Sequence, residues 1–398
     1  MEKNRKKYRV ILGLFMIILT LSGCSGEGGK AQQETGKEDN NSQQNILEES
    51  ENLAEGYRTV YEKAKETDSL NTEGTIREII AYLGESGYSA VDRENQINMV
   101  NAEKAESFCK EAQAGETSEG TILIVIDNGG FVRYDLSSSD GKIKVDRTNL
   151  SWDEEGNPQA KTVDSYQAAA WNYTEKGYLF LELERPAGFD GSSGHTAIRI
   201  APLTEDLRRW NADCIMSIGY AGNNLFTTDW SAENYGDLCF YDLYEPFYKM
   251  KFGQAKTFDA KVGTKEYEIP AEEMESVITA FLPVSSETLR AEEKFDEAHA
   301  CYVYRQRGQY DLGGNPDTPY PEVVDCEENG DGTITLTVDA VWKKGNTDKA
   351  FSHKVRIQPK DDGTFYYLSN QIIPSERNQI PEYVPRLTDE EWETYYSG

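Results

Sequence analysis

The run TILIVI at residues 121–126 decides the fold, because helical spacing gives way there to strands. It is a continuous apolar, β-branched run, which is typical of a buried strand. The turn DNGG follows at residues 127–130, and further glycine turns precede an alternating run at residues 178–183. Strands at this spacing, joined by short turns, predict an antiparallel meander and argue against a parallel doubly wound sheet.

Upstream of this run, apolar residues recur at helical spacing in three segments within residues 51–115. The first runs from Leu53 to Ala64. The second begins at Ile76, after the cap candidate Thr72, and a third, less regular one ends at Ala112. These spacings predict three helices whose apolar stripes face the core.

Downstream of residue 183, the hydrophobic spacing fits neither helix nor strand consistently at first, and it becomes regular again from about Pro270 onward. An aromatic-rich segment ends at residue 252 and is expected to break near Pro246, while Thr204 is a candidate cap for an earlier helix. Pro270 and Ser286 each mark a predicted helix start. Predicted strands then follow at 301–305, 323–326, 333–342, 352–357 and 364–372.

The sequence therefore predicts an α+β fold with N-terminal helices, an antiparallel β-meander region, and a C-terminal helix-plus-antiparallel-sheet module. A linker at residues 24–50 is expected to be disordered, since it has almost no apolar side chain. The expected segments are a signal peptide at 1–23, the linker at 24–50, a helical segment at 51–115, a β-rich region with a mixed, aromatic-rich second half at 116–252, an α+β module at 253–373 and a tail at 374–398.

The first 24 residues have the pattern of a secretory signal that ends in a lipid attachment site. A basic start is followed by a weakly polar-to-apolar run at 10–21, which is too short to span a membrane. Ser22 and Gly23 are small, as a cleavage site before Cys24 requires. The segment resembles the lipobox signal of bacterial lipoproteins.

That resemblance implies cleavage between Gly23 and Cys24 and diacylglyceryl attachment to the Cys24 sulfur. The chain would then be lipid-anchored on the outer face of the cell membrane. An ordinary secretion signal and an uncleaved anchor are the alternatives.

Composition and spacing limit the chemistry that the chain offers. Its formal charge of −29 repels phosphate backbones and disfavours nucleic-acid binding. The three histidines lie far apart, and no Cys/His spacing indicates a metal or cofactor site. The acidic run from Asp325 to Asp331 resembles a calcium loop, but its twelfth position is Leu336, so we interpret it as a hairpin turn.

Three further groups of residues are weighed as sites. Ser193 and His195 lack the frame of a nucleophilic serine, so no catalytic residue is predicted. Trp230 lies in a polar stretch and is predicted to be an exposed, ligand-facing aromatic. Cys301 and Cys326 flank a loop between predicted strands; free buried thiols are the expected state, and a disulfide between them is the alternative.

The run GTFYYL at residues 363–368 and the acidic, Tyr-rich composition give the body a resemblance to uncharacterised lipoproteins of Gram-positive Firmicutes. This resemblance implies no activity. We expect a non-enzymatic protein that binds a protein or cell-wall ligand. A tethered hydrolase acting on wall sugar or peptide and the solute receptor of a transporter are the alternatives.

Overall fold

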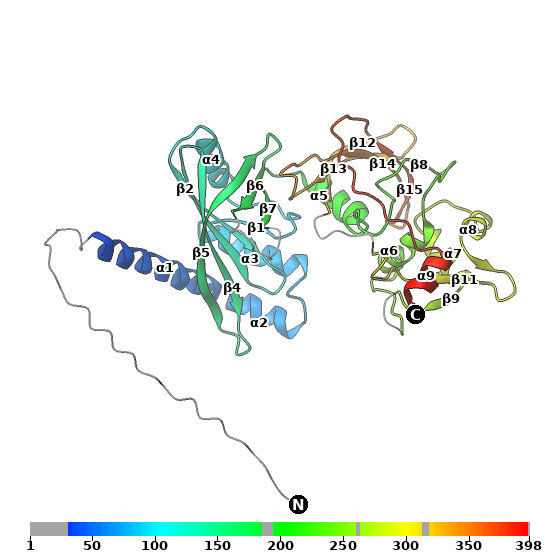
Figure 1. Cartoon of the computed structure of the whole chain (residues 1–398), viewed down its shortest axis with the longest axis horizontal. Helices are drawn as coiled ribbons and strands as arrows, with labels where there is room; N and C mark the ends of the chain where they lie inside the picture. Colours follow the sequence, from blue (N-terminus) through cyan, green and yellow to red (C-terminus); the bar gives the residue numbers. More distant parts are fainter. Residues whose placement is uncertain (1–30, 185–193, 260–262, 313–317, 397–398) are drawn as a thin grey trace, which may run out of the picture. The chain divides into compact units, whose positions relative to one another are not determined.

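The computed structural model describes residues 31–184, 194–259, 263–312 and 318–396 (Figure 1). The chain divides into two compact units, Met1–Asn45 and Ile46–Gly398. Helix α1 (Ala31–Gly56) begins in the first unit and ends in the second. The second unit combines helices with largely antiparallel sheets, so the α+β prediction is confirmed.

Among the described residues, the first sheet of the second unit has the strand order β1-β2-β3-β4-β5-β6-β7. Strand β1 pairs in parallel with β2, and every later neighbouring pair is antiparallel, which confirms the meander. The strands are β1 (Ser89–Asp92), β2 (Ser118–Val125), β3 (Phe131–Ser139), β4 (Lys142–Trp152), β5 (Pro158–Tyr173), β6 (Tyr178–Leu183) and β7 (His195–Arg199).

Strand β1 was not predicted, because residues 51–115 were expected to be helical throughout. Its four residues are all buried, so it shows no alternation that would distinguish it from the helices around it. The crossover from β1 to β2 contains helix α4 (Ala102–Gln113), as a parallel connection requires.

Helices cover both faces of this sheet. Ile122 and Ile124 point toward α4, where they share a buried cluster with Phe108. Leu123 and Val125 point the other way, into a cluster with residues of α2 (Arg58–Glu66) and α3 (Glu73–Glu85). Successive strand residues face opposite sides, so a continuous apolar run is what a strand covered on both faces needs.

The predicted linker is corrected by helix α1. The described residues from Ala31 onward are helical, whereas residues 24–50 were expected to be disordered. Ser50 and Ala54 are fully buried, and Leu47 and Leu53 pack against the cluster beneath α3. Gln- and Glu-rich sequence has good helix propensity even without apolar residues, and packing of the last turns fixes the helix.

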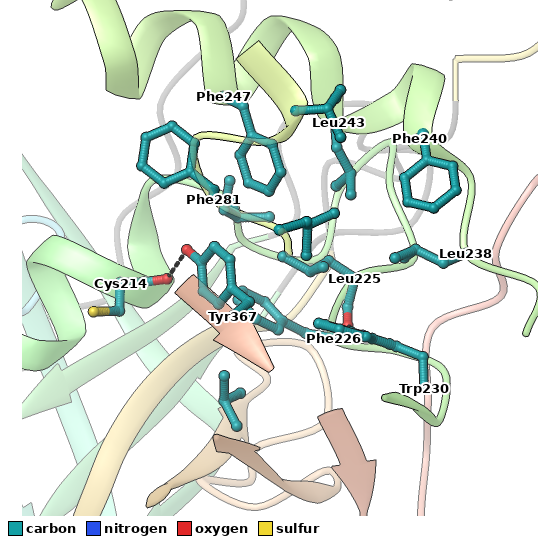
Figure 2. Close-up of a cluster of buried hydrophobic side chains, with 14 of the residues drawn as sticks. Cys214, Leu225, Phe226, Trp230, Leu238, Phe240, Leu243, Phe247, Phe281 and Tyr367 are labelled. Atoms are coloured by element: carbon teal, nitrogen blue, oxygen red, sulfur yellow. Dashed lines mark hydrogen bonds between the residues drawn. The ribbon is translucent and has the colours of Figure 1, made fainter. Parts of the chain in front are cut away.

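The second half of this unit is built around helix α6 (Phe240–Phe252), which runs through Pro246 without ending. The expected break is therefore wrong. Phe240, Leu243 and Phe247 are buried on one side of the helix (Figure 2), and this burial outweighs the hydrogen bond that Pro246 cannot donate. Tyr367 packs on Phe247 in the same core.

Two smaller sheets share a buried core with α6. Among the described residues their orders are β12-β13-β14-β15-β8 and β10-β11-β9. The strands are β8 (Trp230–Ser231), β9 (Glu266–Pro270), β10 (Phe295–Asp296), β11 (Cys301–Arg305), β12 (Tyr320–Glu328), β13 (Ile334–Val341), β14 (Ser352–Pro359) and β15 (Phe365–Ile372). The helices are α5 (Glu205–Trp210), the π-helix η1 (Asn211–Met216), α7 (Ala271–Ile278), α8 (Ser286–Glu292) and α9 (Asp389–Tyr396).

The C-terminal module is larger than residues 253–373. Strand β8 pairs with β15, and α6 supplies much of the same core, although both precede residue 253. The predicted strands and the helices after Pro270 and Ser285 are present. What the sequence missed was long-range pairing, which a local pattern does not report.

A buried polar junction connects the first sheet to β12. Arg199 on β7 forms an ion pair of 2.6 Å with Glu322, and their side chains are 5% and 3% exposed. Tyr178 donates a hydrogen bond of 2.7 Å to the same carboxylate. Asn95 caps the free edge of β7, since it donates to the Ala197 carbonyl and accepts from the Arg199 amide.

Candidate functional site

A cavity of about 310 Å³ lies at the N-terminal end of α6, and we call it the α6 pocket. Its walls come from the start of α6, from β9 and β11, from the turn after α8, and from the segment that leads into α9. The lining residues are Cys239, Tyr241, Glu266, Glu293, Lys294, Val303, Arg305, Arg386, Leu387 and Asp389.

Asp242 fixes the wall that the C-terminal segment contributes. Its fully buried carboxylate accepts hydrogen bonds of 2.6 Å from Arg307 Nη2, Arg386 Nη1 and the Tyr383 hydroxyl. Burial raises the pKa of Asp242, but the Arg307 hydrogen bond and the Arg386 charge outweigh it and hold that pKa below its usual value. Arg386 also packs over the rings of Tyr241 and Tyr304, so it has little freedom.

Four charged side chains pair with one another at the rim. Lys294 Nζ lies 3.4 Å from Glu266 Oε1 and 3.1 Å from Asp389 Oδ2. Arg305 Nη2 lies 2.5 Å from Glu266 and 2.8 Å from Asp389. Two cations and two carboxylates therefore compensate each other, and the Asp389 contacts hold the start of α9 against the pocket.

Glu293 is the pocket carboxylate that differs from these. It is partly buried, and its Oε1 accepts a hydrogen bond of 3.0 Å from the Tyr241 amide at the start of α6. Among the described residues, no Lys, Arg or His forms an ion pair with it. Burial raises the pKa of Glu293 to about 7, against the opposing effects of the Tyr241 amide and the Arg386 charge.

Cys239 supplies the thiol of the pocket, at the position just before α6. Burial raises the pKa of this thiol to about 12, so it is protonated at neutral pH. A thiolate is the nucleophilic form, and none of the three histidines lines the pocket to generate it. The arrangement thus offers hydrogen bonds and charge for holding a ligand.

A larger cavity of about 390 Å³ lies between α4 and β2, and its polar side chains are used internally apart from the exposed Glu119. Lys104 Nζ donates to the Gly87 carbonyl at 2.6 Å, and Thr121 donates to Asp135 at 2.7 Å. Phe108 and Leu136 make much of the remaining wall apolar. The α6 pocket is the better candidate because it contains a partly buried carboxylate, that of Glu293, which no cation of the described residues pairs with.

A family model described as a family of unknown function (DUF6070) matches residues 43–386. The chain belongs to the DUF6070 family. The DUF6070 match begins within α1, covers all three sheets and includes the α6 pocket as far as Arg386. No curated protein and no solved structure matches the chain.

Trp230 is not an exposed aromatic, which corrects the prediction. It is 5% exposed, and Figure 2 shows it within the core, where its Nε1 donates to the Leu225 carbonyl at 2.7 Å. The surrounding residues are polar because they satisfy backbone groups of an irregular segment: Asn224, for example, donates to the Asp237 carbonyl and accepts from the Cys239 amide. A polar neighbourhood therefore did not mean exposure.

Cys301 and Cys326 are not paired; both are free thiols. Cys301 lies on β11 and Cys326 on β12, and these strands belong to different sheets. Two strands that follow one another in sequence thus carry these cysteines into separate sheets.

The acidic run that resembles a calcium loop is a hairpin turn between β12 and β13, as interpreted from the sequence. Asp331 accepts from the Thr333 amide and forms an ion pair with Arg356, so its carboxylate is already used. Within the described ranges, no group of three or more His, Cys, Asp or Glu side chains is placed to hold a metal ion.

The remaining predicted residues fall partly outside the described part of the chain. Gly23, Cys24 and Ser193 lie outside it, and His195 begins β7. No helix within the described ranges has the length and apolarity to cross a membrane.

Sequence reasoning missed Glu293 and Arg386, the two residues that distinguish the α6 pocket. Glu293 is one of many acidic residues, and Arg386 lies in a proline-rich segment that was interpreted as a tail. They come together because Arg386 binds Asp242 in the first turn of α6, and Glu293 accepts a hydrogen bond from the Tyr241 amide in the same turn. No local pattern in the sequence marked either residue, and the break expected at Pro246 left the extent of α6 unrecognised.

Proposed function

We propose that this DUF6070 protein is a lipid-anchored, extracytoplasmic binding protein that holds a small polar ligand in the α6 pocket. The observation that supports binding is a cavity of about 310 Å³ with a charged, internally braced lining. Ligand sites usually occupy roughly 300–1,000 Å³ and contain a few well-placed polar groups. The anchor rests on the pattern of residues 1–24 and on Cys24.

Binding is favoured over covalent catalysis by the state of the pocket's groups. Cys239 is a neutral thiol, and Lys294 and Arg305 are engaged with carboxylates. A nucleophile would need an activating base within hydrogen-bond reach. The walls are instead fixed by internal ion pairs, and fixed walls lower the entropic cost of holding a ligand.

A tethered hydrolase is the second candidate, and Glu293 is the observation that favours it. A carboxyl group with a pKa of about 7 suits a general acid, and Asp389 lines the same pocket as a second carboxyl group. Release of reducing sugar or free amine from purified wall fragments by the full chain, lost in Glu293→Gln, would establish this candidate and end the non-enzymatic proposal. A solute receptor is expected to have strands that alternate with helices. The sheets of this chain are largely antiparallel, so this alternative gains no comparable support.

The anchor is tested by metabolic labelling with radioactive palmitate in a Gram-positive host. The full chain should be labelled, Cys24→Ala should not, and the matched neighbour Ser25→Ala should remain labelled. Equal labelling of Cys24→Ala and the full chain would refute lipidation at this residue.

Binding is tested by thermal unfolding of the full chain in detergent with a panel of amines, sugars, dicarboxylates and short peptides. At least one class should raise the melting temperature, since a ligand that binds only the folded state stabilises it. Leu387→Trp, which fills the pocket from an irregular segment, should remove the rise. A panel without any effect, or a rise that Leu387→Trp leaves intact, would refute the proposed site.

A further inference from the structure

We propose that the ligand of the α6 pocket carries a primary ammonium group and that Glu293 is the residue that binds it. The inference rests on the proposed function, because it requires the pocket to be a binding site. It names the chemical class of the ligand and the side chain that selects it.

The cations of the pocket are already committed, which disfavours an anionic ligand. Lys294 and Arg305 share the carboxylates of Glu266 and Asp389 at the rim. Arg386 is bound to Asp242 and to the Arg305 carbonyl. An incoming anion would have to break one of these contacts and leave a carboxylate of the protein without its partner.

Glu293 differs from them, because its carboxyl group accepts backbone amides and forms no ion pair with a Lys, Arg or His among the described side chains. A partly buried carboxylate without an ion pair is costly, and a cation in the adjoining cavity would compensate it. Glu293 Oε1 already accepts the Tyr241 amide. A compact ammonium group needs only one carboxylate oxygen, so it suits this site better than a guanidinium, whose planar fork takes both oxygens.

The charge of the whole chain acts in the same direction. With a formal net charge of −29, the protein attracts cations toward its surface and repels anions. The field thus raises the local concentration of ammonium-bearing molecules at the pocket mouth, and Glu293 provides the specific contact inside it.

Binding of this kind releases protons from the protein. Only the ionised form of Glu293 pairs with an ammonium group, and with a pKa of about 7 it is about half protonated at pH 7. Ammonium binding should therefore release about half a proton at pH 7 and nearly one at pH 6, and the apparent affinity should fall as the pH falls.

The experiment is titration calorimetry of the full chain in detergent with three five-carbon probes: 1,5-diaminopentane, 1,5-pentanediol and glutarate. Phosphate and MOPS buffers at pH 7 have different ionisation enthalpies and neither carries a primary ammonium group, so the difference in heat reports the protons released. Glu293→Gln keeps the amide-accepting oxygen and removes the charge. Glu292→Gln is the matched control, since Glu292 is the exposed neighbour at the end of α8.

We expect the diamine to bind and the diol and glutarate to bind at least tenfold more weakly. Glu293→Gln should lose at least tenfold in diamine affinity, whereas Glu292→Gln should keep the affinity of the unmodified chain. Equal affinity for diol and diamine, an unaffected Glu293→Gln, or a heat independent of buffer would each overturn the inference. The buffer comparison uses the unmodified chain, so it stands even where a variant folds poorly.

The inference and the proposed function fail in different ways. Binding of glutarate or the diol that Leu387→Trp removes, without diamine binding, would overturn the ammonium assignment and leave the pocket as a binding site. No binding by these probes or by any member of the panel would overturn both.

Discussion

Asp242→Asn should be among the most destabilising isosteric substitutions in the second unit. The side chain of Asp242 is fully buried and neutralises two guanidinium groups, Arg307 at 9% exposure and Arg386 at 17%. Asparagine keeps the shape but removes the charge, so both cations lose their partner. Removing one member of a buried ion pair costs about 3–5 kcal/mol, and we expect a loss of unfolding free energy in this range.

The assay is urea unfolding of the full chain followed by tryptophan fluorescence and circular dichroism, which yields the unfolding free energy of each variant. Asp237→Asn is the matched control, because Asp237 is exposed and lies just before α6. It should change the free energy by no more than about 0.5 kcal/mol.

A second substitution separates lost charge from lost packing. Arg307→Met in the Asp242→Asn background removes one of the two unpaired cations, so the double variant should be more stable than the sum of the single losses predicts. A loss below about 1 kcal/mol for Asp242→Asn, or strict additivity in the double variant, would refute the conclusion that Asp242 holds the C-terminal segment through charge.

Three further predictions concern the rest of the second unit. Glu322→Gln should cost about 3–5 kcal/mol in urea unfolding, because it leaves the buried Arg199 unpaired; a loss under 1 kcal/mol would contradict this. Burial lowers the pKa of His353 to about 4. An unfolded histidine binds its proton near pH 6.5, so the protein should lose about 3 kcal/mol as the pH falls from 6.5 to 4, and His353→Gln should flatten that slope. Gly177→Ala should destabilise by about 2 kcal/mol or more, since φ is +86° and the new Cβ would lie 2.1 Å from the Ala201 Cβ. Gly141→Ala, with φ of +73° and open space, should cost about 1–2 kcal/mol and calibrate the backbone contribution.

The local elements of this chain could be predicted well from the sequence, because their signals are short-range. Thr72 caps α3 through a hydrogen bond from the Thr75 amide, as a threonine before an apolar stripe predicts. The alternating run at Tyr178–Leu183 is a strand with those same bounds. The cap joins residues of a single turn, and β6 pairs with β5 and β7, the strands next to it along the chain.

Errors arose where a distant partner decided the outcome. Trp230 is buried because β8 pairs with β15, more than 130 positions later in the chain. Pro246 stays within α6 because the aromatic core on one side of the helix holds it there. Cys301 and Cys326 remain separate because the strands that carry them join different sheets.

The sequence by itself determined the class of the fold, the order of most helices and strands, and the pattern at Gly23 and Cys24 from which we propose a lipid anchor. Periodicity, turn residues and a local motif were enough for these, since each depends on neighbours along the chain. Only the tertiary structure decided where the candidate site lies. Glu293 and Arg386 reach one cavity through α6, and the acidity of Glu293 is set by burial and by which cations are already paired, which are properties of three-dimensional packing.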